Sequence, residues 1–327
     1  FRDLLCDFYI TFNNPEAAIP LLQATLDRYP YSINHWNSLG KCYLSTNDYE
    51  EAHEAIDFAL AIDDSNAEAL TLKAFCYQQS GELQKSCDYY LRLAEQQENK
   101  TRAYLALAKT YFEMQDYTSS IYYIEALLDN KDALSKYELS ELYGDIALCH
   151  AALKHIGVGQ ASIRRSLELN ENDPDTLIVA GRFFLMEAKA CNDETAKAEN
   201  QAKGELYFRQ ALNLIMEDER LDYLFTIGAA CFDTQNFKLA AQYYEQINRE
   251  FPDNAPATYF FLAYCYFYLE EAISCMHYIA KMKHELPDAY SNLGTSDSIL
   301  SDTRFNELMR NLKDSVNNGK VDLDNFL

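Results

Sequence analysis

Three consecutive stretches decide the fold: residues 33–66 read INHWNSLGKCYLSTNDYEEAHEAIDFALAIDDSN, residues 67–100 read AEALTLKAFCYQQSGELQKSCDYYLRLAEQQENK, and residues 101–134 read TRAYLALAKTYFEMQDYTSSIYYIEALLDNKDAL. They align without a gap over 34 positions each. Equivalent positions carry a bulky residue, then a small one, then a tyrosine. In order these are Trp36, Leu70 and Tyr104; Gly40, Ala74 and Ala108; Tyr43, Tyr77 and Tyr111. A fixed period of this length is typical of an array in which each unit is a hairpin of two helices.

The same spacing of large and small residues continues on both sides of these three units, and it predicts about eight hairpins up to about residue 286. Further units start near Ser140, Pro174, Leu221 and Thr258. One hairpin cannot bury its apolar face alone, so neighbouring hairpins must stack. We therefore expect an all-α protein, an α-solenoid with almost no β-structure. Such arrays usually offer an extended binding surface rather than a closed catalytic cavity.

This pattern of positions resembles the tetratricopeptide repeat (TPR) family. The resemblance implies that the first helix of each hairpin lines a concave groove, which holds a peptide or a helix of another protein. Some members of the family hold a carboxyl-terminal chaperone peptide with a fixed set of inward Lys, Asn and Arg residues. Here Thr71 and Ala106 stand where that set has Asn and Arg, so the chaperone function is not carried over.

Two departures from the repeat are expected to shape the ends and one edge of the array. Between Glu187 and Lys203 one hairpin gains about eleven residues rich in Ala, Glu and Lys, which predicts lengthened helices. After Pro287 the repeat is lost, and a final amphipathic helix begins at Asp302. We expect a TPR-like array over 1–286, a C-terminal cap over 287–316 and a tail over 317–327. Because the chain opens without methionine, we expect it to be a piece of a longer protein.

Composition narrows the class of partner. The chain has 327 residues, 28 basic against 51 acidic, and a net charge of −23. This charge opposes binding to nucleic acid or to an anionic membrane surface. There is no run of eighteen apolar residues that predicts membrane insertion. We interpret the acidic surface as a solvated outer face that keeps a long array soluble, in preference to a site for a specific basic partner.

No residue is nominated for catalysis, for a cofactor or for a metal. The nine cysteines form no CxxC motif and do not have the spacing of zinc ligands. Most of them fall at positions where the first helix of a hairpin needs a small buried residue. His150 and His155 are five residues apart, which does not place them on one helical face. Phosphate-loop, dinucleotide and hydrolase motifs are absent from the sequence. We therefore expect a non-enzyme, and the cysteine usage favours a reducing, cytoplasmic location.

The resemblance does nominate a partner-binding groove, because the inward positions of each first helix can be assigned from the repeat. In the N-terminal half these candidates are polar and mildly basic, whereas in the C-terminal half they are mostly aromatic. The candidates are Asn37, Lys41, Phe75, Arg102, Lys109, Phe112, Arg182, Phe225, Phe232, Tyr259 and Tyr266. The aromatic strip has two interpretations, an exposed ligand groove or core, and the sequence leaves both open. Lys109 and Arg182 are expected to lie in the same groove.

These observations predict a protein–protein interaction scaffold that binds a protein or peptide in the concave groove. An alternative is a regulatory or substrate-recruiting module of an enzyme whose catalytic part lies outside these residues. A third is a sensor whose groove takes a small signalling peptide. The sequence names neither the partner nor the oligomeric state.

Overall fold

A computed structural model describes residues 14–129, 134–292 and 299–317 of the chain. Within these ranges the regular elements are helices, and no strand occurs. The all-α solenoid of hairpins that the repeat predicted is thus confirmed. The chain divides into two compact units, unit 1 over residues 1–142 and unit 2 over residues 143–327.

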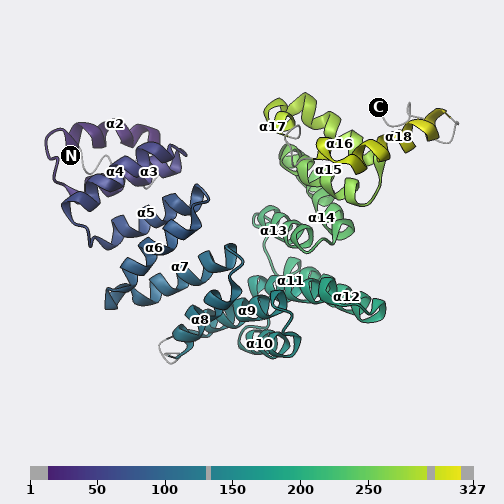
Figure 1. The fold of residues 1–327 in the computed structure, drawn as a ribbon, viewed down its shortest axis with the longest axis horizontal. Helices are drawn as coiled ribbons and strands as arrows, with labels where there is room; N and C mark the ends of the chain where they lie inside the picture. Colours follow the sequence, from purple (N-terminus) through teal and green to yellow (C-terminus); the bar gives the residue numbers. More distant parts are fainter. Residues whose placement is uncertain (1–13, 130–133, 293–298, 318–327) are drawn as a thin grey trace. The chain divides into compact units, whose positions relative to one another are not determined.

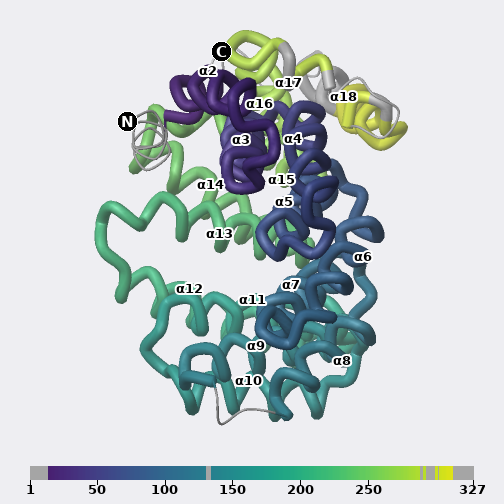
Figure 2. The backbone as a smooth tube through the Cα atoms, turned by 90° about the vertical axis from the view of Figure 1, so that its left-hand side faces the viewer, coloured from purple at the N-terminus to yellow at the C-terminus, as the bar shows by residue number. Residues whose placement is uncertain are grey.

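Unit 1 is a row of hairpins that follow one another along the chain (Figure 1). A helix α2 (Pro15–Leu26) precedes three hairpins, α3 (Ile33–Ser45) with α4 (Tyr49–Ile62), α5 (Ala67–Gln79) with α6 (Leu83–Ala94), and α7 (Lys100–Glu113) with α8 (Tyr117–Leu128). The short η1 (Gln97–Asn99) leads into α7. The first helices α3, α5 and α7 succeed one another along one side of the unit (Figure 2), and α3 contacts α5 directly.

Unit 2 repeats this plan. The helix α9 (Lys136–Ala152) begins in unit 1 and ends in unit 2. It is followed by α10 (Ile156–Leu169), α11 (Pro174–Ala190), α12 (Glu194–Leu212), α13 (Arg220–Asp233), α14 (Phe237–Glu250), η3 (Pro252–Thr258), α15 (Tyr259–Tyr268), α16 (Ala272–Glu285), α17 (Pro287–Asn292), η4 (Ile299–Ser301) and α18 (Thr303–Asn317). At 17 and 19 residues, α11 and α12 are the lengthened helices that the insertion predicted.

The turns inside the three hairpins of unit 1 share one geometry. Asn47, Gly81 and Gln115, which are 34 residues apart, all have a positive φ, of 63°, 76° and 60°. The next backbone N–H then donates to the carbonyl of the repeat tyrosine five residues earlier. These bonds run from Asp48 to Tyr43 (2.9 Å), from Glu82 to Tyr77 (2.8 Å) and from Asp116 to Tyr111 (2.9 Å). The residue with positive φ, together with this hydrogen bond to the carbonyl five residues earlier, ends the first helix and reverses the direction of the chain.

The small residues of the repeat lie where paired helices touch. A methyl group built on Gly40 would come within 2.7 Å of the Ile56 side chain, and one on Gly228 within 2.9 Å of the Tyr244 ring. Ala74 and Ala108 are buried at the equivalent positions. Close approach of the two helices therefore depends on a residue with almost no side chain, as the repeat predicted.

The cysteines of the first helices are core residues. Cys42, Cys76, Cys149, Cys231 and Cys265 are buried and unbridged. Burial in apolar surroundings raises the pKa of the Cys76 thiol to about 11 and that of Cys265 to about 12. Such thiols stay protonated at neutral pH and behave as small apolar side chains.

The last helices pack onto the end of unit 2. Ile299 and Phe305 are buried, and the Arg304 guanidinium lies over the rings of Phe267 and Tyr268. This packing agrees with a terminal helix that covers the last apolar face of an array. The boundaries expected at 286 and 316 stay predictions, and the expected tail, apart from Asn317, lies outside the described residues.

Candidate partner-binding face

The repeat places one position of each first helix of unit 1 on a common face. Lys41 on α3, Phe75 on α5 and Lys109 on α7 are 34 residues apart, and all three side chains are exposed. Seven residues, or about two turns, earlier on the same helices lie Asn34, Glu68 and Arg102, which are also 34 residues apart. We call the surface made by Lys41, Glu68, Phe75, Arg102 and Lys109 the first-helix face.

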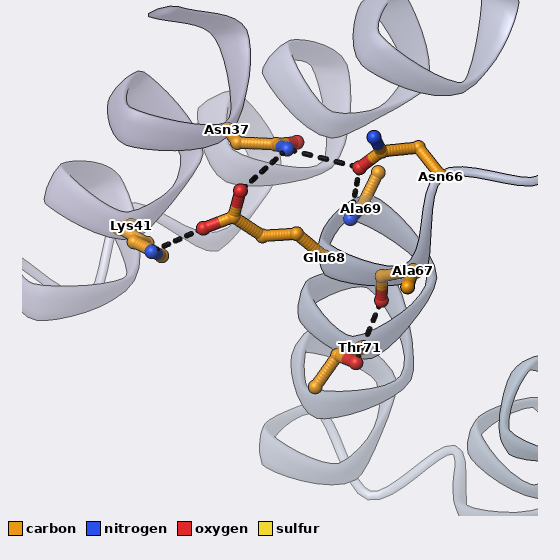
Figure 3. A network of polar contacts seen from close by, with 7 residues as sticks. All are labelled: Asn37, Lys41, Asn66, Ala67, Glu68, Ala69 and Thr71. Carbon is orange, nitrogen blue, oxygen red and sulfur yellow. Dashed lines mark hydrogen bonds and ion pairs between the residues drawn. The ribbon is translucent and has the colours of Figure 1, made fainter. Parts of the chain in front are cut away.

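A polar network ties the first two helices of this face together (Figure 3). The Asn37 amide nitrogen donates to Asn66 Oδ1 (3.1 Å) and to Glu68 Oε2 (3.0 Å). Lys41 Nζ donates to the other oxygen of Glu68 and pairs with its charge. Asn66 Oδ1 also accepts from the backbone N–H of Ala69 (3.0 Å), so that Asn66 is the N-cap of α5.

Glu68 is the residue that sequence reasoning missed. It shares its repeat position with Asn34 and Arg102, and this spacing was the signal that could have identified it. Partial burial favours a higher pKa for its carboxyl, but hydrogen bonds from Lys41 and Asn37 and the nearby charges of Lys41 and Arg102 outweigh that cost and lower the pKa. A carboxylate at this point, in the first turn of α5, also complements the helix dipole.

The network corrects the expected role of Asn37, whereas Lys41 stays a candidate. Asn37 is only 1% exposed, so its side chain is not part of an open groove, and its Oδ1 has no hydrogen-bond partner among the described residues. Lys41 is exposed but already paired with Glu68. The Thr71 hydroxyl likewise has a partner within its own helix, since it donates to the Ala67 carbonyl (2.8 Å).

The next first helix, α7, leaves two cations open. Arg102 and Lys109 are both exposed, and neither makes an ion pair or hydrogen bond with any residue in the described parts of the chain. The Gln78 amide on α5 donates to both oxygens of Glu113 on α7 (2.8 and 2.9 Å). Phe75 remains 41% exposed. The half-buried ring of Phe112 lies edge-on to Tyr117 at 5.4 Å.

In unit 2 the predicted residues divide between surface and core. Arg182 is half-buried and pairs with Asp233 at 3.6 Å. Phe225 and Phe232 are half-buried. Phe232 lies edge-on to Phe237 and Phe261, at 5.7 and 5.5 Å between ring centroids.

Two members of the aromatic strip are core residues rather than an exposed surface. Tyr259 is 4% and Tyr266 9% exposed. Their hydroxyls donate to carboxylates of helix neighbours, Tyr259 to Glu285 at 3.2 Å and Tyr266 to Glu245. Burial and this hydrogen bond raise the pKa of Tyr266. Lys109 belongs to unit 1 and Arg182 to unit 2, and their expected place in one groove stays a prediction.

His150 and His155 lie close together because the turn between α9 and α10 brings them together. His150 near the end of α9 and His155 at the start of α10 bring their Nδ1 atoms to 3.4 Å, although they share no helical face. Over the described residues, no group of three or more His, Cys, Asp or Glu side chains is arranged to hold a metal ion. Among the described helices, none combines the length and apolar character that a bilayer crossing requires.

Comparison with known proteins identifies the repeat. Residues 9–74 match the family model described as tetratricopeptide repeat. A tetratricopeptide repeat protein from Parabacteroides merdae superposes with a TM-score of 0.61 at 12% identity, over 76% of this chain and 92% of that one. The C-terminal part of a TPR repeat-containing protein from Cytophaga hutchinsonii has a TM-score of 0.49 at 14% identity, over 76% and 95%. YrrB, described as a TPR protein with an unusual peptide-binding site, has a TM-score of 0.40 at 14% identity, over 62% and 96%.

A comparison with curated protein sequences finds no match. The matched residues cover the first of the 34-residue stretches and part of the second, and the same hairpin then recurs through both units. Residues 9–74 therefore match the tetratricopeptide repeat family, and the hairpins that follow them have the same fold.

Proposed function

We propose that this protein is a protein–protein interaction scaffold that holds a segment of a partner protein on the first-helix face of unit 1. The observation that supports this most is the exposed row Lys41, Phe75 and Lys109, with Arg102 beside it. The row sets an apolar ring between cations in a chain whose net charge is −23. Exposed aromatic residues with charged neighbours are typical anchors of protein interfaces.

The partner segment has a chemistry that follows from this row. Arg102 and Lys109 are open to carboxylates, whereas the charge of Lys41 is already compensated by Glu68. We therefore expect an acidic side chain near α7 and an apolar side chain over Phe75. The acidic remainder of the protein repels such a segment, so the local cations decide where it binds.

The expected contribution of Phe75 follows from its exposure. A phenylalanine side chain buries about 200 Å², so the 41% that is exposed leaves about 80 Å² for a partner to cover. At about 25 cal/mol per Å² this area contributes about 2 kcal/mol, or about 30-fold in Kd. Loss of Phe75 should therefore be visible in any quantitative binding assay.

The test is capture from native lysate with quantitative mass spectrometry. It compares wild type, Phe75→Ala, and the double variant Arg102→Glu, Lys109→Glu. Matched controls are Tyr122→Ala and the double variant Arg28→Glu, Lys136→Glu, which change exposed residues outside the first-helix face. The same proteins should be lost from both face variants and retained by both controls. Equal capture by face and control variants would refute the proposal.

The proposal includes a non-catalytic role in the cytoplasm. Its support is that the buried cysteines are free thiols, as in proteins of reducing compartments, and that the sequence nominates no catalytic residue. A role as the recruiting module of an enzyme stays open as the alternative. The same capture experiment separates the two, since the alternative predicts an enzyme's substrates among the captured proteins.

A further inference from the structure

A second docking surface lies on unit 2, on the side of the second helices α12 and α14. Two adjoining depressions, of about 480 and 620 Å³, meet at Asn213 just after α12. The smaller is lined by α12, the start of α13 and α14, and the larger by α10, α11 and α12. We call the two together the outer groove, defined by Leu167, Tyr207, Arg209, Leu214, Arg220 and Arg249.

The smaller depression is cationic. Arg209, Arg220 and Arg249 all line it, and Glu205 is the only acid among its lining residues. Arg209 and Arg220 each use a single nitrogen on an acidic neighbour, Arg209 on Glu205 and Arg220 on Glu250. A guanidinium has five N–H donors, so most of those on the two arginines stay available.

Arg249 has no partner in the described part of the chain. It is exposed, and it makes no ion pair or hydrogen bond with any described residue. Arginine with open donors binds carboxylates in two-point contacts, which are stronger than contacts to neutral acceptors. Glu205 and Glu250 compensate the charges of Arg209 and Arg220, so the net positive charge of the depression comes from Arg249, in a protein whose overall charge is −23.

The larger depression is more apolar. Its apolar lining residues are Leu167, Leu177, Tyr207 and Leu214, of which Leu214 is 47% exposed, and its charged ones are Arg164, Glu168 and Glu171. Met216 and Leu206, on either side of the end of α12, are also large exposed apolar residues. An apolar surface directly beside three arginines suits a chain segment in which an apolar residue is followed by acidic ones.

We propose that the outer groove binds an extended segment of a partner protein in which a bulky apolar residue adjoins a run of Asp or Glu. The apolar residue covers Leu167, Tyr207 and Leu214, and the carboxylates reach Arg209, Arg220 and Arg249. This site lies on unit 2, whereas the first-helix face lies on unit 1, and the two share no helix and no residue. It gives the scaffold a second point of attachment.

The test is fluorescence anisotropy on the full chain with two labelled dodecapeptides, one with two leucines followed by six glutamates, the other with glutamines in place of the glutamates. Wild type should bind the acidic probe about tenfold more tightly or better, although its net charge repels that probe. The double variant Arg209→Gln, Arg249→Gln should lose most of this preference. The double variant Arg28→Gln, Arg310→Gln removes the same charge from exposed arginines that line neither depression, and it should keep the preference.

Two further variants test the apolar half of the outer groove and its independence from the first-helix face. Leu214→Ser should weaken both probes, since they share the leucines. The first-helix variant Arg102→Glu, Lys109→Glu should bind the acidic probe as wild type does, so failure of one site does not imply failure of the other. Absence of a preference for the acidic probe in wild type, or an equal loss in the two arginine double variants, would overturn the proposal. Circular dichroism melting of each variant checks that unit 2 remains folded.

Discussion

Gly181→Ala tests most sharply whether the small positions of the repeat set the distance between paired helices. A methyl group on Gly181 of α11 would lie 2.3 Å from Cε1 and 2.6 Å from Cδ1 of Phe208 on α12. Carbon atoms in contact normally stay about 3.5 Å apart, so ring and helix must separate by about 1 Å. Phe208 is fully buried, and the close packing of a protein core leaves its ring little room to move aside.

The magnitude follows from two opposing effects. Overpacking of a well-packed core costs about 1–3 kcal/mol, and an approach this short belongs at the upper end. Alanine gains about 1 kcal/mol over glycine from its helix propensity. We therefore expect the free energy of unfolding to fall by about 2 kcal/mol. The matched control is Gly157→Ala on α10, where a methyl group meets no atom within 4 Å and only the propensity gain remains.

The assay is urea unfolding followed by circular dichroism, combined with hydrogen exchange of the α11 and α12 amides. Exchange is needed because an array of two units need not unfold in a single step, and it reports the local free energy of opening. Protection of α11 and α12 should fall in Gly181→Ala and rise or stay unchanged in Gly157→Ala. Wild-type protection in Gly181→Ala would refute the packing argument.

Two further predictions concern pH and the aromatic strip. The pKa of Glu68 is lowered in the folded protein, so its ionised carboxylate stabilises the fold at neutral pH. This stabilisation is lost as the pH falls through the pKa of the folded state. The difference in melting temperature between wild type and Glu68→Gln should therefore be largest near neutral pH and should disappear in acid. A difference that does not depend on pH would contradict this prediction. Phe232→Ala removes a half-buried ring with edge-on contacts to Phe237 and Phe261, and urea unfolding should show a loss of about 2 kcal/mol. Unchanged stability would mean that Phe232 belongs to the surface alone.

The backbone of this protein could be predicted from its sequence because each hairpin repeats the same local chemistry. The 34-residue spacing located the small positions at Gly40, Ala74 and Ala108, and the structure repeats a left-handed turn residue with the same spacing at Asn47, Gly81 and Gln115. These features depend on residues within one hairpin. The spacing of small and large residues therefore carried enough information to predict them.

The candidate site depends on side chains from different repeats, and here prediction was weaker. Glu68 reaches back across the repeat to Asn37 and Lys41, a contact set by side-chain length and conformation that the repeat pattern does not specify. Tyr259 and Tyr266 match the positions of a groove, yet both are buried with their hydroxyls on carboxylates. An aromatic row has the same sequence pattern whether a neighbour covers it or not. The division of the chain near Leu142 was not predicted either.

Photo-crosslinking from the first-helix face tests the proposed scaffold function most directly. The photoreactive amino acid p-benzoylphenylalanine replaces Phe75 in one protein and Tyr122, exposed on the second helix α8, in another. Both are irradiated in native lysate, with and without the Arg102→Glu, Lys109→Glu substitutions. We predict a discrete crosslinked partner from position 75 that disappears with the charge reversals and is absent from position 122. The same products from both positions, or products from position 75 that survive the charge reversals, would contradict binding at this face.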